Sequence, residues 1–277
     1  MNDICNINYE YNEFCSLLSS DNFFKNRFSI YKIIKENNNK ITMIVYCSIL
    51  QKLCFLKVKI FNNSPNKCID FDVYELLKKN NHDNIEIVYD IIVNKNFIYI
   101  LTEYISGTNL AQLHNILNKE ILKKIINQTY EGLNYIHKLN IIHGDIKLEN
   151  IMFTNNQQIK IIDFDLSRIC NNYISSKILF GSENYIAPES FDLHIYSKKS
   201  DVWSFGISLY KLILNKFPYK YKLNKSCHLR TRNNFKCLNL QELDILVNIY
   251  GTDIINIIKK MLNFVDDNRP LNIKLEI

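Results

Sequence analysis

The chain has 277 residues, 47% of them hydrophobic and 22% charged, which is the balance of an ordinary globular protein. No apolar run reaches the roughly 18 residues of a membrane-spanning helix, and the first ten residues are polar and acidic, unlike a secretory signal. The net charge of +6 is mild, so we expect no membrane or nucleic-acid partner and a cytoplasmic location, in the host cytoplasm if the source is a virus or parasite.

The first third of the chain is predicted to be rich in strands. Residues 1–27 show no clear period and are interpreted as an N-terminal extension, and residues 28–104 as a nucleotide-binding part. Five apolar runs there are typical of strands, and one amphipathic helix follows the third run. The expected strands are Phe28–Ile34, Ile41–Leu50, Leu53–Ile60, Ile85–Val93 and Phe97–Glu103, and the expected helix is Ile69–Asn80.

Residues 105–277 are predicted to be mainly helical. Apolar residues spaced by three and four predict a helix over Glu120–Lys138, and further helices are expected over Lys199–Leu214 and Asp253–Leu262. The order of elements predicts an α+β fold with a small lobe of five strands and one helix and a larger, mainly helical lobe. A local excess of lysine and arginine over 216–236 is either a solvated basic face or a docking patch for an acidic partner.

The eight cysteines are scattered, with no Cys-x-x-Cys pair and no metal-ligand spacing. We therefore expect reduced, structural cysteines. Cys47 and Cys54 lie in apolar segments typical of strands and are predicted to be core thiols.

The stretch from Ile141 to Asp163 carries the most chemical information. Asp145, Lys147 and Asn150 lie close together in it, and an apolar run and a turn then lead to Asp163. Phosphoryl transfer needs such a set: a carboxylate for the hydroxyl proton, a cation for the moving phosphoryl group and oxygen ligands for Mg²⁺. The alternative is a set of buried ion pairs that only supports a core, and four such groups at these spacings argue against it.

The stretch from His143 to Phe164 resembles the catalytic and metal-binding loops of the protein-kinase family. By this resemblance, Asp145 orients or deprotonates the substrate hydroxyl and Lys147 contacts the transferring phosphate. Asn150 and Asp163 would bind Mg²⁺. A lysine two residues after the catalytic aspartate is the serine/threonine form of that loop. The resemblance thus implies ATP and Mg²⁺ as cofactors and a protein, of unknown identity, as substrate.

Two positions depart from the family pattern. Gly144 stands where the family usually has arginine, and Asp165 stands where it usually has glycine. Without that arginine, control by a phosphate on the activation segment is disfavoured, because the phosphate lacks its cationic partner. The sequence here is also similar to small-molecule phosphotransferases of the aminoglycoside and choline kinase type.

Later segments favour a protein kinase over that alternative. Residues 181–189 resemble the end of an activation segment, and Asp201 resembles the aspartate that braces the catalytic loop, although alone it would be an ordinary helix N-cap. Arg269 stands where the family's arginine pairs with the equivalent of Glu189. Small-molecule phosphotransferases lack this set, so the resemblance extends over about residues 28–277 and implies a bilobal protein-kinase-like fold.

The nucleotide-binding residues are assigned by the same resemblance. Lys57 resembles the strand lysine that binds the α- and β-phosphates, although Lys59 points to the same face of the strand and alternation alone does not choose between them. Thr102 would guard the inner pocket. Glu103 and Ile105 would offer backbone hydrogen bonds to adenine, Asn109 would meet the ribose, and Met152 would lie beneath the adenine ring.

The phosphate-covering loop matches the family least. The best register places Asn38, Lys40 and Met43 at its three glycines and Val45 at its end, against the nucleotide, and the chain has no glycine before Gly107. Glycine serves in such loops because it adopts positive φ and lets the backbone approach phosphate closely. We therefore expect ATP binding that is weaker or differently shaped, but not necessarily absent.

The helix that normally supplies a glutamate to the strand lysine gives no firm partner for Lys57. Val73 falls at that position, and Asp72 and Glu75 are the nearest acids. These gaps leave a pseudokinase scaffold as an alternative. The complete set of strand lysine, catalytic aspartate, amide and second acid favours an active ATP- and Mg²⁺-dependent serine/threonine protein kinase.

Overall fold

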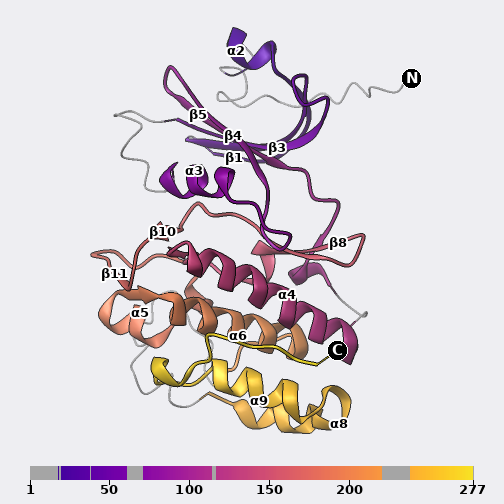
Figure 1. Ribbon diagram of the computed structural model, residues 1–277, viewed down its shortest axis with the longest axis vertical. Helices are drawn as coiled ribbons and strands as arrows, with labels where there is room; N and C mark the ends of the chain where they lie inside the picture. Colours follow the sequence, from indigo (N-terminus) through magenta and orange to yellow (C-terminus); the bar gives the residue numbers. More distant parts are fainter. Residues whose placement is uncertain are drawn as a thin grey trace. The chain divides into compact units, whose positions relative to one another are not determined.

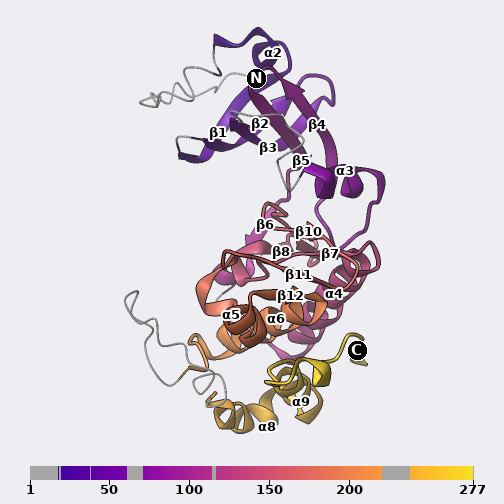
Figure 2. The ribbon, with the colours of Figure 1, turned by 90° about the vertical axis from the view of Figure 1, so that its left-hand side faces the viewer.

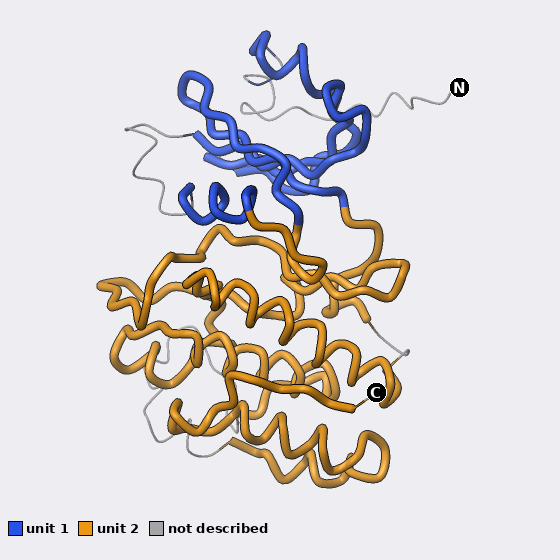
Figure 3. Tube along the Cα trace, in the orientation of Figure 1, with its two compact units in different colours: residues 1–79, 87–104 blue, residues 80–86, 105–277 orange. Residues whose placement is uncertain are grey.

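The computed structural model describes residues 18, 20–37, 39–60, 71–113, 117–219 and 238–276. The chain divides into two units, which are coloured separately in Figure 3. The first comprises Met1–Lys79 and Ile87–Tyr104, and the second comprises Asn80–Glu86 and Ile105–Ile277. Most of the basic stretch at 216–236 lies outside the described residues.

The first unit is built on one antiparallel sheet with the strand order β1-β2-β3-β5-β4. The pattern of apolar residues predicts all five strands, and the helix α3 follows the third strand as expected. Its elements are α2 (Asn22–Lys25), β1 (Phe28–Asn37), β2 (Lys40–Cys47), β3 (Lys52–Ile60), α3 (Phe71–Lys79), β4 (Val88–Asn94) and β5 (Phe97–Glu103).

Three strand ends differ from the sequence prediction by three residues: β1 extends to Asn37, and the other two differ for a local reason. β2 ends at Cys47, because Cys47 pairs with Lys52 and the intervening residues turn, with Gln51 at φ +52°. β4 begins at Val88, because the residues before it join the second unit, where Ile85 forms a parallel bridge with Ile161.

Opposite faces of the sheet have different neighbours (Figure 1). One face forms the main core of the first unit with Leu18 and Phe24, which come from the segment before β1. The other face carries Lys57 and lies toward α3, since the Lys57 ammonium contacts Tyr74 of that helix. The two faces follow from the alternation of side chains along each strand.

The second unit is mainly helical, with three small sheets of order β6-β8-β9, β10-β7 and β11-β12 (Figures 1 and 2). Its helices are α4 (Lys119–Lys138), α5 (Pro188–Leu193), α6 (Lys198–Leu214), α8 (Val247–Tyr250) and α9 (Thr252–Met261), and its 3₁₀ turns are η2 (Leu110–Gln112), η3 (Leu148–Asn150), η4 (Glu183–Tyr185), η5 (Leu240–Leu246) and η6 (Asp266–Asn268). Its strands are β6 (Gly107–Asn109), β7 (Ile141–Ile142), β8 (Ile151–Thr154), β9 (Ile159–Ile161), β10 (Arg168–Ile169), β11 (Tyr173–Ser175) and β12 (Ile195–Ser197).

Helix α6 is the central element of this unit and lies between α4 and α9 in Figure 1. A capping box of Ser197 and Ser200 fixes its start, which satisfies backbone N–H groups that otherwise lack partners. Trp203, Phe205 and Tyr210 are fully buried, so the helix is apolar on most sides, as expected of a core helix. Its first turn therefore offers a rigid mount for Asp201.

Cys47 and Cys54 are free and buried, which confirms their prediction as core thiols. Burial raises the pKa of Cys54 to about 11, so it remains a neutral thiol at physiological pH. None of the described helices combines the length and apolar character required to cross a membrane.

Candidate active site

A turn between β7 and η3 places Asp145 at the centre of a hydrogen-bonded cluster. The Oδ2 atom of Asp145 accepts from Lys147 Nζ at 2.7 Å and from Asn150 Nδ2 at 3.1 Å. Its Oδ1 atom accepts from the backbone N–H of Ser182 at 2.8 Å. Asp145 is only 9% exposed, and these donors hold its carboxylate in one orientation. The structure thus brings together three of the predicted site residues.

Asp201 braces the catalytic loop, as the resemblance implies. Its Oδ2 accepts from the backbone N–H of His143 and from His137 Nε2, both at 2.9 Å, and its Oδ1 accepts from the N–H of Gly144 at 2.9 Å. The carboxylate lies in the first turn of α6, where the helix dipole favours a negative charge. His137 of α4 is a partner that the sequence patterns alone did not indicate.

His143 orients the loop from inside. It is fully buried, its Nδ1 accepts the N–H of Asp145 at 3.2 Å, and its Nε2 donates to the carbonyl of Ile162, also at 3.2 Å. Burial lowers the pKa of His143, which keeps the ring neutral with its proton on Nε2. The ring links the strand before Asp163 to the loop that bears Asp145.

Asn150 and the segment before Asp163 are joined through the backbone. The Ile162 N–H donates to the Asn150 carbonyl at 3.0 Å, and the Asp163 N–H donates to Glu86 Oε1 at 2.7 Å. Asp163 has φ +69°, a left-handed conformation that the packed surroundings impose on a residue other than glycine. Both hydrogen bonds that Asn150 Nδ2 donates go to Asp145, and among the described residues its side-chain oxygen accepts none.

This donor set fits Mg²⁺ rather than a metal held only by the protein. Within the described ranges, no group of three or more His, Cys, Asp or Glu residues is arranged to hold a metal ion. Mg²⁺ typically takes one or two protein oxygen ligands and completes its shell with water and substrate phosphates. By the resemblance, Asn150 and Asp163 would supply an amide oxygen and a carboxylate for such a role.

The residues assigned to the nucleoside lie on the sheet of β6, β8 and β9. Asn109 pairs directly with Met152, so the predicted ribose and adenine contacts are neighbours in the structure. The Oδ1 atom of Asn109 is buried and has no hydrogen-bond partner among the described residues. Such an acceptor suits a ligand hydroxyl, because an unpaired buried polar atom is costly. Ile105, in the connector that leads to β6, is half-buried.

Lys57 of β3 is 3% exposed, and its Nζ donates to the hydroxyl of Tyr74 at 3.0 Å. Tyr74 is the neighbour of Val73, the residue that the sequence register placed at the glutamate position. A phenol therefore lies against the lysine where the pattern led us to look for a carboxylate. The sequence did not predict Tyr74 as a partner, because the family pattern calls for a carboxylate and only Asp72 and Glu75 carry one nearby.

Val45 lies on the opposite face of the sheet from Lys57, which corrects its assignment to the nucleotide. Thr42 pairs with Lys57 and Ile44 with Phe55, so these residues share the lysine face. Val45 pairs with Cys54 and is fully buried in the core. A shift of one residue along a strand exchanges its two faces, so Ile44 takes the place expected for Val45.

At the end of β5, Glu103 already uses its side chain and its N–H within the first unit. Its Oε1 accepts from the Ile87 N–H at 2.8 Å, and its own N–H donates to the Ile87 carbonyl at 2.9 Å. Thr102, next to it, is 1% exposed, and its hydroxyl has no partner in the described part of the chain. Thr102 pairs with Phe55, so this unpaired hydroxyl lies on the lysine face of the sheet.

The described residues at the end of β1 and the start of β2 pair as a hairpin. Asn37 pairs with Lys40, and Asn37 Oδ1 accepts from the N–H groups of Asn39 and Lys40 at 3.0 and 2.8 Å. Met43 pairs with Leu56 and is fully buried, with φ outside the positive region. Asn38 lies outside the described residues, and the effect of this loop on ATP binding stays a prediction.

The end of the activation segment contacts the catalytic cluster through Ser182. Its hydroxyl accepts from Lys147 Nζ at 2.7 Å, so the lysine bridges Ser182 and Asp145. The contact of Ser182 with the catalytic cluster was not predicted, although the sequence shows a hydroxyl residue directly after Gly181. Beyond it, Arg269 forms a two-pronged ion pair with Glu189, with N–O distances of 2.7 and 2.8 Å, which confirms that predicted pair.

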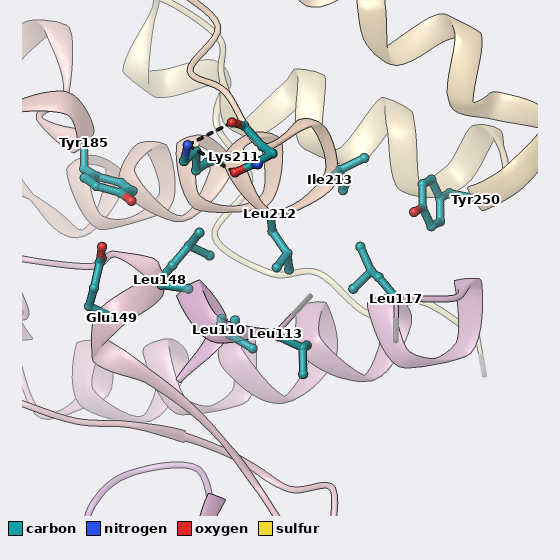
Figure 4. Close-up of a pocket in the computed structure, with 12 residues that line it drawn as sticks. Leu110, Leu113, Leu117, Leu148, Glu149, Tyr185, Lys211, Leu212, Ile213 and Tyr250 are labelled. Atoms are coloured by element: carbon teal, nitrogen blue, oxygen red, sulfur yellow. Dashed lines mark hydrogen bonds between the residues drawn. The ribbon is translucent and has the colours of Figure 1, made fainter. Parts of the chain in front are cut away.

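A pocket of about 410 Å³ adjoins the catalytic loop within the second unit (Figure 4). Leu148 and Glu149, which lie between Lys147 and Asn150 in the chain, form one side of it. Lys211 and Leu212 of α6 lie opposite, as Figure 4 shows. Its lining combines leucines and other apolar residues with polar ones, and Glu149 and Lys211 are its charged side chains.

Comparison with known proteins gives a consistent result. A sequence profile described as protein kinase domain matches residues 47–274. The serine/threonine-protein kinase plk-2 of Caenorhabditis elegans is 33% identical over 144 residues, which are 51% of this chain and 23% of that protein. A probable serine/threonine-protein kinase of Clostridium acetobutylicum is 31% identical over 188 residues, 66% of this chain and 27% of that protein. The chain thus matches less than a third of the length of each of these relatives.

Proposed function

Since the chain belongs to the protein-kinase family, in its serine/threonine class, we propose that it transfers the γ-phosphate of ATP to a serine or threonine hydroxyl of a protein with the aid of Mg²⁺. The observation that carries the proposal is the arrangement of Asp145. Its carboxylate is fixed by Lys147, Asn150 and the Ser182 N–H, while Asp201 fixes the loop beneath it.

Each residue has a role that follows from its charge and contacts. Asp145 orients the acceptor hydroxyl and takes its proton, and Lys147 places a positive charge beside the same carboxylate. Asn150 and Asp163 offer oxygen ligands to Mg²⁺. ATP with Mg²⁺ supplies the phosphoryl group and neutralises the charge on its phosphates. Lys57 is assigned to the phosphates, and Asn109 and Met152 to the nucleoside.

The end of the activation segment supports a protein as the acceptor. Small-molecule phosphotransferases lack the set formed here by Glu189, Asp201 and Arg269, and the first and last of these are joined by an ion pair. We also assign the pocket lined by Leu148 and Glu149 to a side chain of a protein substrate, because these two residues lie between Lys147 and Asn150 in the chain.

The test is incubation of the purified chain with Mg²⁺, labelled ATP and a generic basic protein, followed by identification of the phosphorylated residue type. We expect phosphoserine or phosphothreonine. Asp145→Asn should lower the rate by about 10²–10⁴-fold, because the base is lost. Asp192→Asn, which changes an exposed acid of α5, should retain the wild-type rate.

The other outcomes separate the alternatives. Nucleotide binding with no transfer, together with capture of a specific partner, would favour a pseudokinase scaffold. Transfer to an aminoglycoside or choline but to no protein would favour a small-molecule phosphotransferase. A protein that binds no nucleotide with Mg²⁺ would exclude the enzymatic proposal.

A further inference from the structure

We propose that Phe180 and Tyr196 form an aromatic clamp that holds the end of the activation segment against Asp145 without a phosphate. The inference rests on the proposed function and adds to it how the site is regulated. Both residues lie outside the catalytic cluster, so we regard them as positioning residues.

The clamp is a stacked pair with two further hydrogen bonds. The ring centroids of Phe180 and Tyr196 are 3.7 Å apart and the ring planes differ by 15°. The Tyr196 hydroxyl accepts from the Phe180 N–H at 2.8 Å and donates to the Phe180 carbonyl at 2.9 Å. Tyr196 is 3% exposed. One buried tyrosine therefore fixes the ring, the N–H and the carbonyl of Phe180 together.

Phe180 occupies the space beside Gly144, where the family usually has arginine. A Cβ atom on Gly144 would lie 2.8 Å from Phe180 Cε2, and Gly144 has φ +75°, which side chains rarely adopt. The guanidinium of Arg168 lies 5.1 Å from the centre of the Phe180 ring, within the range of a cation–π contact. An aromatic ring and its cation thus take the place of a loop arginine and a phosphate.

The effect of the clamp can reach Asp145 through two residues. Gly181 follows Phe180 with φ +98°, and a Cβ there would lie 2.7 Å from the Gly144 carbonyl, so the segment passes very close to the catalytic loop. Ser182 then donates its N–H to Asp145 and accepts from Lys147. A shift of Phe180 would move these contacts.

The strand that bears Tyr196 also holds the start of the same segment. In the pairing of β11 with β12, Ile174 lies opposite Tyr196, and the Ser176 N–H donates to the His194 carbonyl at 3.0 Å. Ser176 Oγ donates to the Ile178 carbonyl at 2.7 Å. The segment is therefore tied at both ends by groups present in the unmodified chain, and a phosphate on Ser175 or Ser176 is not needed to order it.

The first test compares untreated enzyme, phosphatase-treated enzyme and the Ser175→Ala variant, which leaves the Ser176 hydroxyl in place, with phosphate content measured by mass spectrometry. We expect rates within about twofold of each other. A rate that disappears with the phosphate, and returns on rephosphorylation, would overturn the proposal.

The second test uses Tyr196→Phe, which keeps the ring stack and removes both hydrogen bonds to Phe180. We expect kcat to fall about tenfold while the KM for ATP stays within twofold, because the clamp acts on the acceptor side of the site. Tyr173→Phe, at an exposed position of β11, is the matched control and should change neither constant.

Two further measurements separate positioning from general damage. If the clamp acts through Ser182, Tyr196→Phe should add little to the loss caused by Ser182→Ala, whereas additive losses would contradict the proposal. Hydrogen exchange at the Phe180 and Ser182 amides should be faster in Tyr196→Phe than in wild type or Tyr173→Phe. Unchanged exchange would overturn the clamp. This measurement does not require kinase activity, so it tests the clamp separately from the proposed function.

Discussion

At the residue scale, the pairing of Lys57 with Tyr74 is the clearest departure from the family pattern. Lys57 is buried, and one of its contacts is a neutral hydroxyl at 3.0 Å. A buried ammonium needs acceptors, because its desolvation is otherwise uncompensated. The tyrosine supplies one without adding a charge, and its ring lies 5.6 Å from Nζ.

Removing that hydroxyl tests whether the contact stabilises the first unit. Tyr74→Phe should lower the free energy of unfolding by about 1.5 kcal/mol, the size of a hydrogen bond to a charged group. Tyr46→Phe, on the neighbouring strand and 45% exposed, should change it by less than about 0.5 kcal/mol. Urea denaturation followed by circular dichroism measures both. Equal values for the two variants would show that the Tyr74 hydroxyl contributes nothing.

His143 gives the second residue-scale prediction, a dependence of stability on pH. Burial lowers its pKa in the folded chain below the ordinary value of about 6.5, so the unfolded chain binds the proton more readily. Its contribution is fully present above that value and is lost as the pH falls below it.

Unfolding free energies at pH 7 and pH 5 should therefore differ more for the wild type than for His143→Asn, which does not titrate in this range. The comparison isolates His143 from His82, whose pKa burial also lowers. An equal change in unfolding free energy between pH 7 and pH 5 in the two proteins would contradict the assignment of a neutral, buried ring.

At the element scale, the five strands of the first unit and the long helices were predictable, but the face to which one strand residue points was not. Long apolar periods marked α4, α6 and α9, and their observed ends fall within one residue of the prediction. In β2, the residues from Ile41 to Val45 are buried on both faces of the sheet. Their sequence therefore lacks the alternation of polar and apolar residues that would assign Val45 to one face. Only the pairing with β3 decides it.

The catalytic cluster was predictable because its members lie close together in the chain. Asp145, Lys147 and Asn150 are neighbours in the chain, and a short turn suffices to join them. Ser182 and Tyr74 reach the site residues from distant segments, and their contacts depend on tertiary packing that no local pattern contains. Sequence reasoning therefore identified the local groups and missed these two partners.

The ion pair of Glu189 and Arg269 is the element-scale prediction, because it joins α5 to the segment after η6. Arg269 is 1% exposed, its guanidinium also donates to the carbonyls of Asn263 and Lys199, and it lies 4.9 Å from the Trp203 ring centre. Removal of one partner from such a pair leaves a buried charge unpaired.

Arg269→Ala should lower the free energy of unfolding by about 3–5 kcal/mol. Lys259→Ala, which breaks the exposed pair of Lys259 and Asp244, should cost no more than about 1 kcal/mol. Thermal unfolding of both variants gives the comparison. A small loss for Arg269→Ala would mean that the pair is replaced easily by solvent.

At the scale of the whole molecule, each unit needs its own core, and the first is completed by residues before β1. Leu18 is fully buried, Phe24 is 3% exposed, and both belong to the core of the sheet. Asp21 accepts from the Tyr99 hydroxyl at 2.9 Å. Burial alone raises the pKa of Asp21, but hydrogen bonds from Tyr99 and Lys95 outweigh this effect and lower it. These contacts are nonlocal, and the segment itself shows no period.

Phe24→Ala should therefore destabilise the first unit by about 3–5 kcal/mol, the usual cost of removing a buried aromatic side chain. Lys25→Ala, at an exposed neighbouring position, should change stability by less than about 0.5 kcal/mol. Hydrogen exchange localises the effect: amides of β1 and β5 should lose protection in Phe24→Ala, while amides of α6 should keep theirs. If β5 amides exchanged equally slowly in Phe24→Ala and Lys25→Ala, the residues before Phe28 would contribute nothing to the stability of the sheet. Faster exchange in β1 and β5 of Phe24→Ala, with α6 unchanged, would show that these residues form part of the unit that carries Lys57.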